Sequence, residues 1–251
     1  MTVVFVHGNP ETADVWGPLV ERLEGRDVVL LSPPGFGAPV PDGFSATMDG
    51  YRDWLVAELE ELRASSGAPV DLVGHDWGGG HVVNVAMARP DLLRSWVSDI
   101  VGVFDEDYVW HDLAQAWQTP ETGEAAVAQM VGAPAADAAA RLSSRGMEGG
   151  VAEKVAAGMN AAMGECILTL YRSAAQPAVA RRGAELEKAA ARPGLSLLAT
   201  EDHMVGTDPQ RRRAAERAGA RTVVLEGLGH WWMTQDPQRG ADVLTRFWDA
   251  L

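Results

Sequence analysis

Short apolar runs alternate with longer amphipathic segments along most of the chain. The runs are rich in Val and Leu, and each is bounded by Gly, Pro, Asp or Arg. Such continuous apolar runs are typical of strands buried on both faces of a parallel sheet. The predicted strands are Val3–Val6, Val28–Leu31, Val70–Val73, Trp96–Val101, Leu195–Ala199 and Thr222–Leu225.

Helical periodicity fills the segments between these runs. The predicted helices are Val15–Leu23, Met48–Ala64, His81–Met87, Pro209–Ala218 and Pro237–Asp249. Alternation of strand and helix predicts an α/β protein with a doubly wound, mostly parallel sheet of about six strands.

The alternation stops between the fourth and fifth predicted strands. That segment is rich in Ala, Gly, Met and Glu and is interrupted by prolines. A structureless loop of such length is uncommon in a compact domain, so several short helices are the better interpretation. We predict a helical cap at 104–190, inserted into a core formed by 1–103 and 191–251.

The amino-acid composition argues against several classes of partner and cellular location. The chain has 251 residues and a formal net charge of −14, which argues against nucleic acid and anionic membranes as partners. No apolar run approaches the length of about eighteen residues that a membrane span needs. The start, MTVVFVHG, lacks a signal-peptide pattern, and a single cysteine, Cys166, fits a reducing compartment. We therefore expect a cytoplasmic protein and leave a homodimer open.

The stretch GHDWGGG at 74–80 follows the third predicted strand. Its frame, Gly74-x-Asp76-x-Gly78, matches a nucleophile elbow, a sharp strand-to-helix turn in which the middle residue is usually serine. An aspartate that only caps the next helix is the alternative. Glycines on both sides favour the elbow, with His75 as a structural hydrogen-bonding residue.

Two further polar residues follow predicted strands. Asp202 lies just after the fifth strand, and His230 lies in the glycine-rich GLGH after the sixth. With Asp76 they give the chain order nucleophile, acid, histidine, which is that of one triad architecture. HGNP at 7–10 follows the first strand, where backbone N–H groups can face an anion.

Together, HGNP at 7–10, GHDWGG at 74–79, TED at 200–202 and GLGH at 227–230 resemble the α/β-hydrolase superfamily. The pair Asp76-Trp77 narrows the resemblance to the epoxide hydrolase and haloalkane dehalogenase branch. Such enzymes usually carry further strands before HGxP, so the expected sheet lacks those N-terminal strands. The resemblance also implies an oxyanion hole made by the N–H groups of Asn9 and Trp77.

An aspartate nucleophile suits attack on an sp³ carbon that carries a leaving group. The product is an ester on the enzyme, which water then cleaves. His230 would take a proton from that water while Asp202 orients the imidazole. This chemistry needs no cofactor, and His7, His75 and His81 lack a matched ligand set for a metal. The expected partners are water and a small apolar epoxide or halide.

The leaving group separates the two activities. An opening epoxide needs an O–H donor, and the resemblance implies two cap tyrosines for that role. Tyr171, followed by an arginine, resembles the second of them. Trp117 stands near the place of the first, and Tyr108 lies nearby in sequence. The expected pocket walls are Trp77, Trp110, Trp117 and Tyr171, although packing within the cap is an alternative role for Tyr171 and Trp117.

Halide chemistry has its own support. One dehalogenase class binds halide with an asparagine and a tryptophan that match Asn9 and Trp77. That class takes its acid from the strand after the elbow helix, where Asp99 lies one residue out of register, which would turn it to the other face. Tyr171 and Asp202 favour an epoxide hydrolase that makes a vicinal diol. A haloalkane or haloacid dehalogenase, or a catalytically silent binding protein, remains the alternative.

Overall fold

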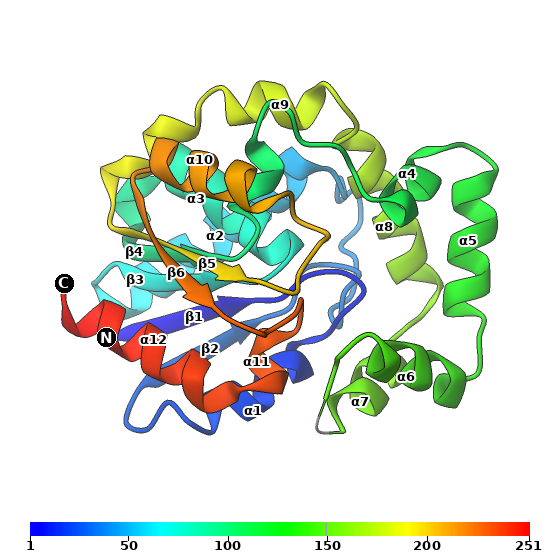
Figure 1. Cartoon of the computed structure of the whole chain (residues 1–251), viewed down its shortest axis with the longest axis horizontal. Helices are drawn as coiled ribbons and strands as arrows, with labels where there is room; N and C mark the ends of the chain where they lie inside the picture. The colour runs from blue at the N-terminus through cyan, green and yellow to red at the C-terminus, as the bar shows by residue number, and fades with distance from the viewer. Residues whose placement is uncertain (149) are drawn as a thin grey trace.

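Six parallel strands form one sheet in the order β2-β1-β3-β4-β5-β6 (Figure 1). The computed structural model describes residues 1–148 and 150–251. The strands are β1 (Thr2–Val6), β2 (Asp27–Leu31), β3 (Val70–Gly74), β4 (Leu93–Ser98), β5 (Gly194–Ala199) and β6 (Ala220–Leu225). All five neighbouring pairs are parallel, which confirms the predicted α/β sheet.

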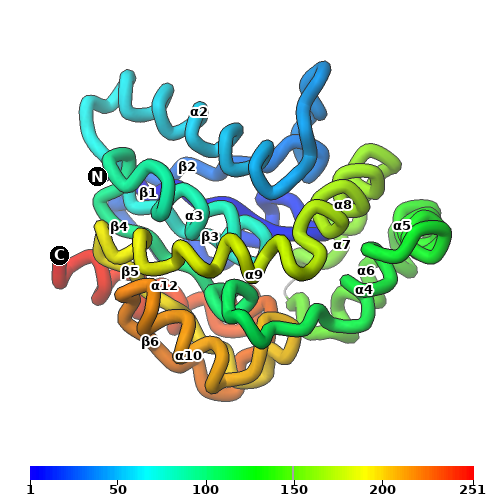
Figure 2. Tube along the Cα trace, turned by 90° about the horizontal axis from the view of Figure 1, so that it is seen from above, coloured from blue at the N-terminus to red at the C-terminus, as the bar shows by residue number. Residues whose placement is uncertain are grey.

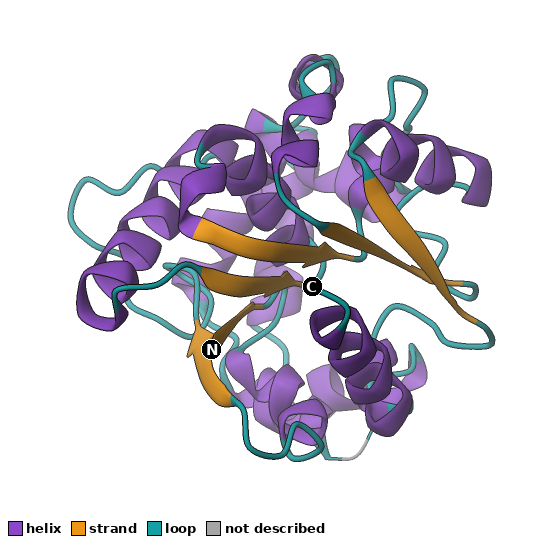
Figure 3. Cartoon of the chain, turned by 90° about the vertical axis from the view of Figure 1, so that its left-hand side faces the viewer, coloured by secondary structure: helices purple, strands orange, loops and turns teal. Residues whose placement is uncertain are grey.

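Helices cover both faces of the sheet (Figure 3). One face packs against α2 (Met48–Ser66), α3 (Trp77–Ala88) and α10 (Asp208–Arg217). The other packs against α1 (Gly17–Val20), α11 (Trp232–Gln235) and α12 (Pro237–Asp249). Side chains of β1 alternate between the two cores, Val4 and Val6 in one and Val3 and Phe5 in the other. Burial on both sides explains why the strands are continuous apolar runs.

Three predicted elements differ from the structure by three residues or more at one end. The strand predicted at Trp96–Val101 begins at Leu93 and ends at Ser98. Arg94 resembles a strand boundary, but it lies within β4, where its guanidinium is 2.7 Å from the carboxylate of Asp71 on the neighbouring β3. Beyond Ser98 the chain turns into the 3-10 helix η3 (Val101–Phe104).

The helix predicted at Val15–Leu23 is a 3-10 turn, η1 (Ala13–Trp16), followed by the short α1. Helix α3 begins four residues before the predicted His81, because the elbow at Asp76 runs directly into it.

The segment without strands forms five helices beyond the carboxyl ends of the sheet (Figures 1 and 2). They are α4 (Asp112–Gln118), α5 (Thr122–Val131), α6 (Ala135–Ser144), α7 (Val151–Ala157) and α8 (Ala161–Ser173). The chain then returns through α9 (Ala178–Gly183) and the 3-10 helix η4 (Leu186–Ala191), which pack on η3 and α3 respectively. Another 3-10 turn, η2 (Pro90–Leu92), precedes β4. Throughout the described ranges, no helix has the length and apolarity to cross a membrane.

Candidate active site

Asp76 sits on a strained turn between β3 and α3. Its backbone has φ 47° and ψ −130°, a region that non-glycine residues rarely occupy. The turn fits because glycines let the backbones approach: a Cβ at Gly78 would lie 2.1 Å from the carbonyl oxygen of Val6, and one at Gly8 would lie 2.3 Å from Asp76 Cβ. These contacts explain the glycine frame that the sequence shows on either side of Asp76.

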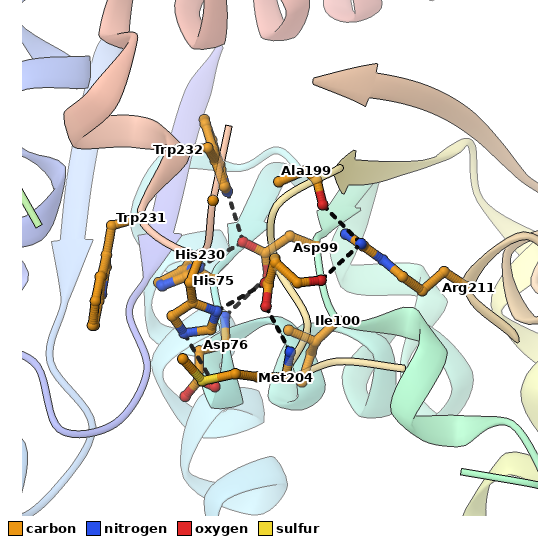
Figure 4. A network of polar contacts seen from close by, with 12 residues as sticks. His75, Asp76, Asp99, Ile100, Ala199, Met204, Arg211, His230, Trp231 and Trp232 are labelled. Atoms are coloured by element: carbon orange, nitrogen blue, oxygen red, sulfur yellow. Dashed lines mark hydrogen bonds and ion pairs between the residues drawn. The ribbon is translucent and has the colours of Figure 1, made fainter. Parts of the chain in front are cut away.

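The structure brings Asp76, His230 and Asp202 together beyond the carboxyl ends of β3, β6 and β5. Figure 4 shows Asp76 and His230 facing each other there. His230 Nδ1 lies 2.9 Å from Asp202 Oδ2, and His230 Nε2 lies 3.8 Å from Asp76 Oδ2. The first distance is a hydrogen bond, and the second is too long for one. The Met204 N–H donates to the other oxygen of Asp202 at 2.9 Å. His230 is therefore oriented by Asp202 and faces Asp76 across a short gap.

Burial and mutual charge set the protonation of these groups. Burial opposes the charge of His230, but Asp202 outweighs it and raises the pKa of the imidazole above 6.5. Burial also opposes the charge of Asp202, and His230 nevertheless holds the pKa of this carboxyl well below its usual range. The pKa of Asp76 is raised by burial, which the positive charge of His230 only partly offsets.

One oxygen of Asp76 accepts a hydrogen bond from a backbone N–H. The Asn9 N–H donates to Asp76 Oδ1 at 2.8 Å. Trp77 is the first residue of α3, so its N–H has no acceptor within the helix. The predicted oxyanion-hole residues thus flank the aspartate, and Oδ2 is the oxygen left facing His230.

A second buried network lies beside the triad and includes Glu11, a residue that the sequence did not single out. His75 Nδ1 lies 2.5 Å from Asp99 Oδ2, and His75 Nε2 lies 3.0 Å from Glu11 Oε1. Indole N–H groups add two further bonds, Trp231 to Glu11 at 2.5 Å and Trp232 to Asp99 at 2.8 Å. His75 therefore has the structural, hydrogen-bonding place that its sequence position suggested.

Asp99, the alternative acid, belongs to this second network. Its Oδ1 accepts the N–H of Asp76 at 3.0 Å, and its Oδ2 faces His75. No hydrogen bond joins it to His230 among the described residues. The carboxylate that orients His230 is that of Asp202, so Asp99 instead fixes the elbow backbone.

The second network holds a buried cation between two carboxylates. Burial lowers the pKa of His75, but Glu11 and then Asp99 outweigh it and raise this pKa well above 6.5. Burial likewise opposes the charge of Glu11, and the imidazolium of His75 still lowers the pKa of Glu11 to about 2. The rings of His75 and His230 lie 4.6 Å apart, so this charge also tends to lower the pKa of His230.

Glu11, His75 and His230 place ligand-type atoms within 4.8 Å of one another. Both nitrogens of His75 already have carboxylate partners, and Nδ1 of His230 is bonded to Asp202. A protonated imidazole is no metal ligand. The chemistry of this set is therefore that of a hydrogen-bond network, and the expectation of no metal stays a prediction.

A cavity of about 280 Å³ opens between the sheet and the helices above it. Asp76 and His230 line it, as do the predicted Tyr171 and Trp117. The rings of Trp117 and Tyr171 lie 4.7 Å apart, and Tyr171 also packs edge-on against Trp77 at 5.4 Å.

Trp77, a predicted wall, does not line this cavity in the described residues, and neither do Trp110 and Tyr108. The polar atoms of the last two are bonded elsewhere: Trp110 Nε1 donates to the carbonyl of Ala174 at 3.2 Å, and the Tyr108 hydroxyl donates to the carbonyl of Met204 at 2.7 Å. The Trp110 ring instead stacks on Trp77 at 5.6 Å, and the Tyr108 ring packs edge-on against Trp110 at 5.1 Å.

Sequence reasoning also missed several residues that line the cavity. They include His111, Met130, Arg141, Arg145, Met159 and Met204. On α6 the spacing of Ala138, Arg141, Leu142 and Arg145 follows one helix face, which was an available signal. The methionines carried no comparable signal, because apolar residues at helical spacing usually mark an ordinary core.

Comparison with known proteins agrees with this fold. The family model for the alpha/beta hydrolase family matches residues 3–243. The chain therefore belongs to the alpha/beta hydrolase family.

Among curated proteins, an epoxide hydrolase of Caballeronia sordidicola is 32% identical over 98 residues, which cover 37% of this chain and 29% of that protein. A second relative, the (E)-2-((N-methylformamido)methylene)succinate hydrolase of Acinetobacter baylyi, is 29% identical over 93 residues, covering 37% of this chain and 34% of the relative. The matched stretch thus spans about a third of the length of these relatives.

Solved structures match along the whole chain. A haloalkane dehalogenase from Bradyrhizobium elkani superposes with a TM-score of 0.70 over 100% of this chain and 91% of its own, at 19% sequence identity. Likeness at this identity establishes the fold alone.

Proposed function

We propose that the protein is a hydrolase that attacks an sp³ carbon with the carboxylate of Asp76, and that it is an epoxide hydrolase giving a vicinal diol. The observation that carries the proposal is the position of a carboxylate at the strained elbow, facing His230 Nε2 at 3.8 Å with Asp202 behind the imidazole. An aspartate in this position favours an alkyl-enzyme ester over acyl transfer.

The first step would use Asp76 Oδ2, because Oδ1 is held by the Asn9 N–H. Oδ2 bonds to one epoxide carbon, the C–O bond of the ring breaks, and the ring oxygen takes a proton. Tyr171 is the hydroxyl-bearing side chain among the cavity residues described. Burial raises the pKa of Tyr171 well above 10, so the phenol is protonated at neutral pH and able to donate a hydrogen bond.

The second step would cleave the ester with water. His230 Nε2 takes a proton from the water, which attacks the carbonyl carbon of the Asp76 ester. Negative charge then develops on Oδ1, the oxygen that already accepts the Asn9 N–H, with Trp77 N–H adjacent. Each such donor is typically worth about 3–4 kcal/mol of barrier.

Haloalkane dehalogenation is the second candidate, and one observation favours it. The side-chain nitrogen of Asn9 is buried without a hydrogen-bond partner in the described structure, and Asn9 lines the cavity. A buried orphan N–H donor beside the nucleophile suits a departing halide. Tyr171 and the Asp202–His230 bond support the epoxide reading, whereas Asn9 supports the halide one.

The test uses His230→Gln, which should permit alkylation and block ester hydrolysis. This variant is incubated with styrene oxide or with 2-phenylethyl bromide, and its intact mass and adduct peptide are measured. A gain equal to the whole epoxide on Asp76 supports the epoxide hydrolase. A gain equal to the alkyl group without bromine supports the dehalogenase.

Matched variants sharpen the choice. Adding Asp76→Asn to His230→Gln should abolish either adduct. Adding Tyr171→Phe should slow epoxide adduct formation about a hundredfold and leave the halide reaction intact, whereas Asn9→Ala should slow the halide reaction while keeping the backbone donor. No adduct from a broad panel of both classes, together with an inactive wild type, would favour a silent binding protein and contradict the proposal.

A further inference from the structure

The cavity carries two arginines that the proposed reaction does not use. Arg141 and Arg145 line it from α6 and the residue that ends this helix. Ala138 and Leu142 line it as well, so the four residues follow the i, i+3, i+4, i+7 spacing of one helix face. The cavity-facing side of α6 is therefore part apolar and part cationic.

Both guanidinium groups lack a protein counter-ion. Within the described ranges no carboxylate forms an ion pair with Arg141 or Arg145, whereas neighbouring cap cations such as Arg172 and Arg182 are paired with Glu124 and Asp49. Free cations are unexpected here, because the chain has a net charge of −14 and 35 acidic residues from which to draw partners.

The cavity has its negative and positive side chains at different places in its lining. Asp76 is the acidic residue among those lining the cavity, and it is half-buried at the elbow, whereas Arg141 and Arg145 are exposed on α6 and at its end. A substrate anion close to Asp76 would be repelled by it. An anion at the other end of the substrate would meet two cations instead.

We propose that the cavity takes a substrate that bears a carboxylate at the end remote from the reacting carbon, with Arg141 and Arg145 holding that carboxylate. The proposal rests on the proposed function, because it names the class of substrate whose other end reaches Asp76. Guanidinium groups match carboxylates in geometry, and apolar lining such as Leu142 and Met159 suits the intervening hydrocarbon.

His111 also lines the cavity. Burial and then the charge of His230 lower the pKa of His111 to about 4, so the ring is neutral at pH 7. His111 Nδ1 accepts the N–H of Ala114 at 3.2 Å, which leaves the proton on Nε2. The ring is thus a neutral hydrogen-bond donor in the lining of the cavity.

The two arginines are not equivalent. Arg145 also lines a second pocket, together with Glu148 and Glu201, so its charge is shared between two pockets. Arg141 borders only the cavity over Asp76 among the described pockets. We therefore expect Arg141 to contribute the larger part of carboxylate binding.

The test measures equilibrium binding by calorimetry and needs no turnover. Straight-chain and phenyl-substituted carboxylates, such as 4-phenylbutyrate, are compared with their neutral primary amides at low ionic strength. The expected preference for the carboxylate is about three- to tenfold, since each partly exposed charge pair contributes modestly. This preference should fall as salt is added.

Substitution of the arginines tests whether they cause the preference for carboxylates over amides. Arg141→Gln should remove most of it and Arg141→Gln/Arg145→Gln all of it, while amide binding stays within about twofold. Arg246→Gln is the matched control, an exposed arginine on α12 away from the cavity. Equal or tighter binding of the amides by wild type, or no carboxylate binding up to about 10 mM, overturns the proposal.

The binding experiment and the adduct experiment can fail independently of each other. Adduct formation on Asp76 in His230→Gln with a neutral epoxide would stand even if carboxylates showed no preference. Conversely, an arginine-dependent carboxylate preference without any adduct would keep the binding site and refute the alkylation chemistry.

Discussion

Replacement of Glu11 by glutamine tests the buried network next to the triad. The change keeps the size of the side chain and removes its charge. Glu11 is fully buried and accepts from His75, from the Trp231 indole, and from the Gly8 N–H at 2.9 Å. A glutamine offers one oxygen for these three donors, and its NH₂ group must face at least one of them.

The pKa of Glu11 gives the size of the effect. Its fall from 4.5 to about 2 on folding corresponds to about 3 kcal/mol, at about 1.4 kcal/mol for each pKa unit. Breaking a buried ion pair by removing one partner usually costs about 3–5 kcal/mol, which agrees. We expect Glu11→Gln to lower the free energy of unfolding by about 3 kcal/mol at pH 7 and the Tm by about 6–12 °C.

The pH dependence supplies a second readout. A carboxyl whose pKa is lowered on folding stabilises the folded protein at pH values above its unfolded pKa, which is 4.5 for Glu11. This stabilisation is lost as the pH falls toward the folded pKa of about 2. The difference between wild type and Glu11→Gln should shrink to about 1.4 kcal/mol near pH 3. Urea unfolding at both pH values measures it, with the exposed Glu24→Gln as control. A difference below about 0.5 kcal/mol at pH 7, or one unchanged by pH, would refute the reasoning.

The remaining predictions concern the triad and its supports. The proposed ester hydrolysis requires neutral His230, so kcat should fall as the pH drops through the pKa of this residue, which is above 6.5. Asp202→Asn removes the main charge that raises this pKa, and it should therefore move the acid limb of the pH–rate profile to lower pH. Gly78→Ala should prevent stable folding, because the new methyl group would lie 2.1 Å from the Val6 carbonyl oxygen; a Tm close to that of wild type would contradict it. Trp232→Phe removes the indole donor to Asp99 and should cost about 1.5–3 kcal/mol in urea unfolding, and an unchanged midpoint would show that this bond is unimportant.

Local chemistry decided which parts of the site could be predicted. Asp76 stands in a glycine frame that only a tight strand-to-helix turn requires, and Asp202 and His230 follow strands whose carboxyl ends meet at one edge of a parallel sheet. Those residues could therefore be placed together before any coordinates were known.

The second network could not be found in the same way. It depends on how Glu11, His75 and Asp99 orient their side chains in three different loops, and neither spacing nor periodicity encodes such a meeting. The same limit applies to Trp110 and Tyr108, whose polar atoms are bonded to backbone carbonyls from α8 and the Asp202 loop rather than presented to the cavity.

The helices above the site share a hydrophobic core with the sheet domain. Leu142 of α6 and Val155 of α7 are buried in the same cluster as Trp16 and Trp232. A rigid swing of these helices away from the sheet would expose that cluster to water, at a cost of about 25 cal/mol for each Å² of apolar surface. We therefore expect ligand entry to depend on rearrangement of side chains, and the methionines that line the cavity, Met130 and Met159, have the unbranched chains for it. The same sharing makes these helices a poor module for exchange between relatives, since their removal would take away part of a core that the sheet domain also needs.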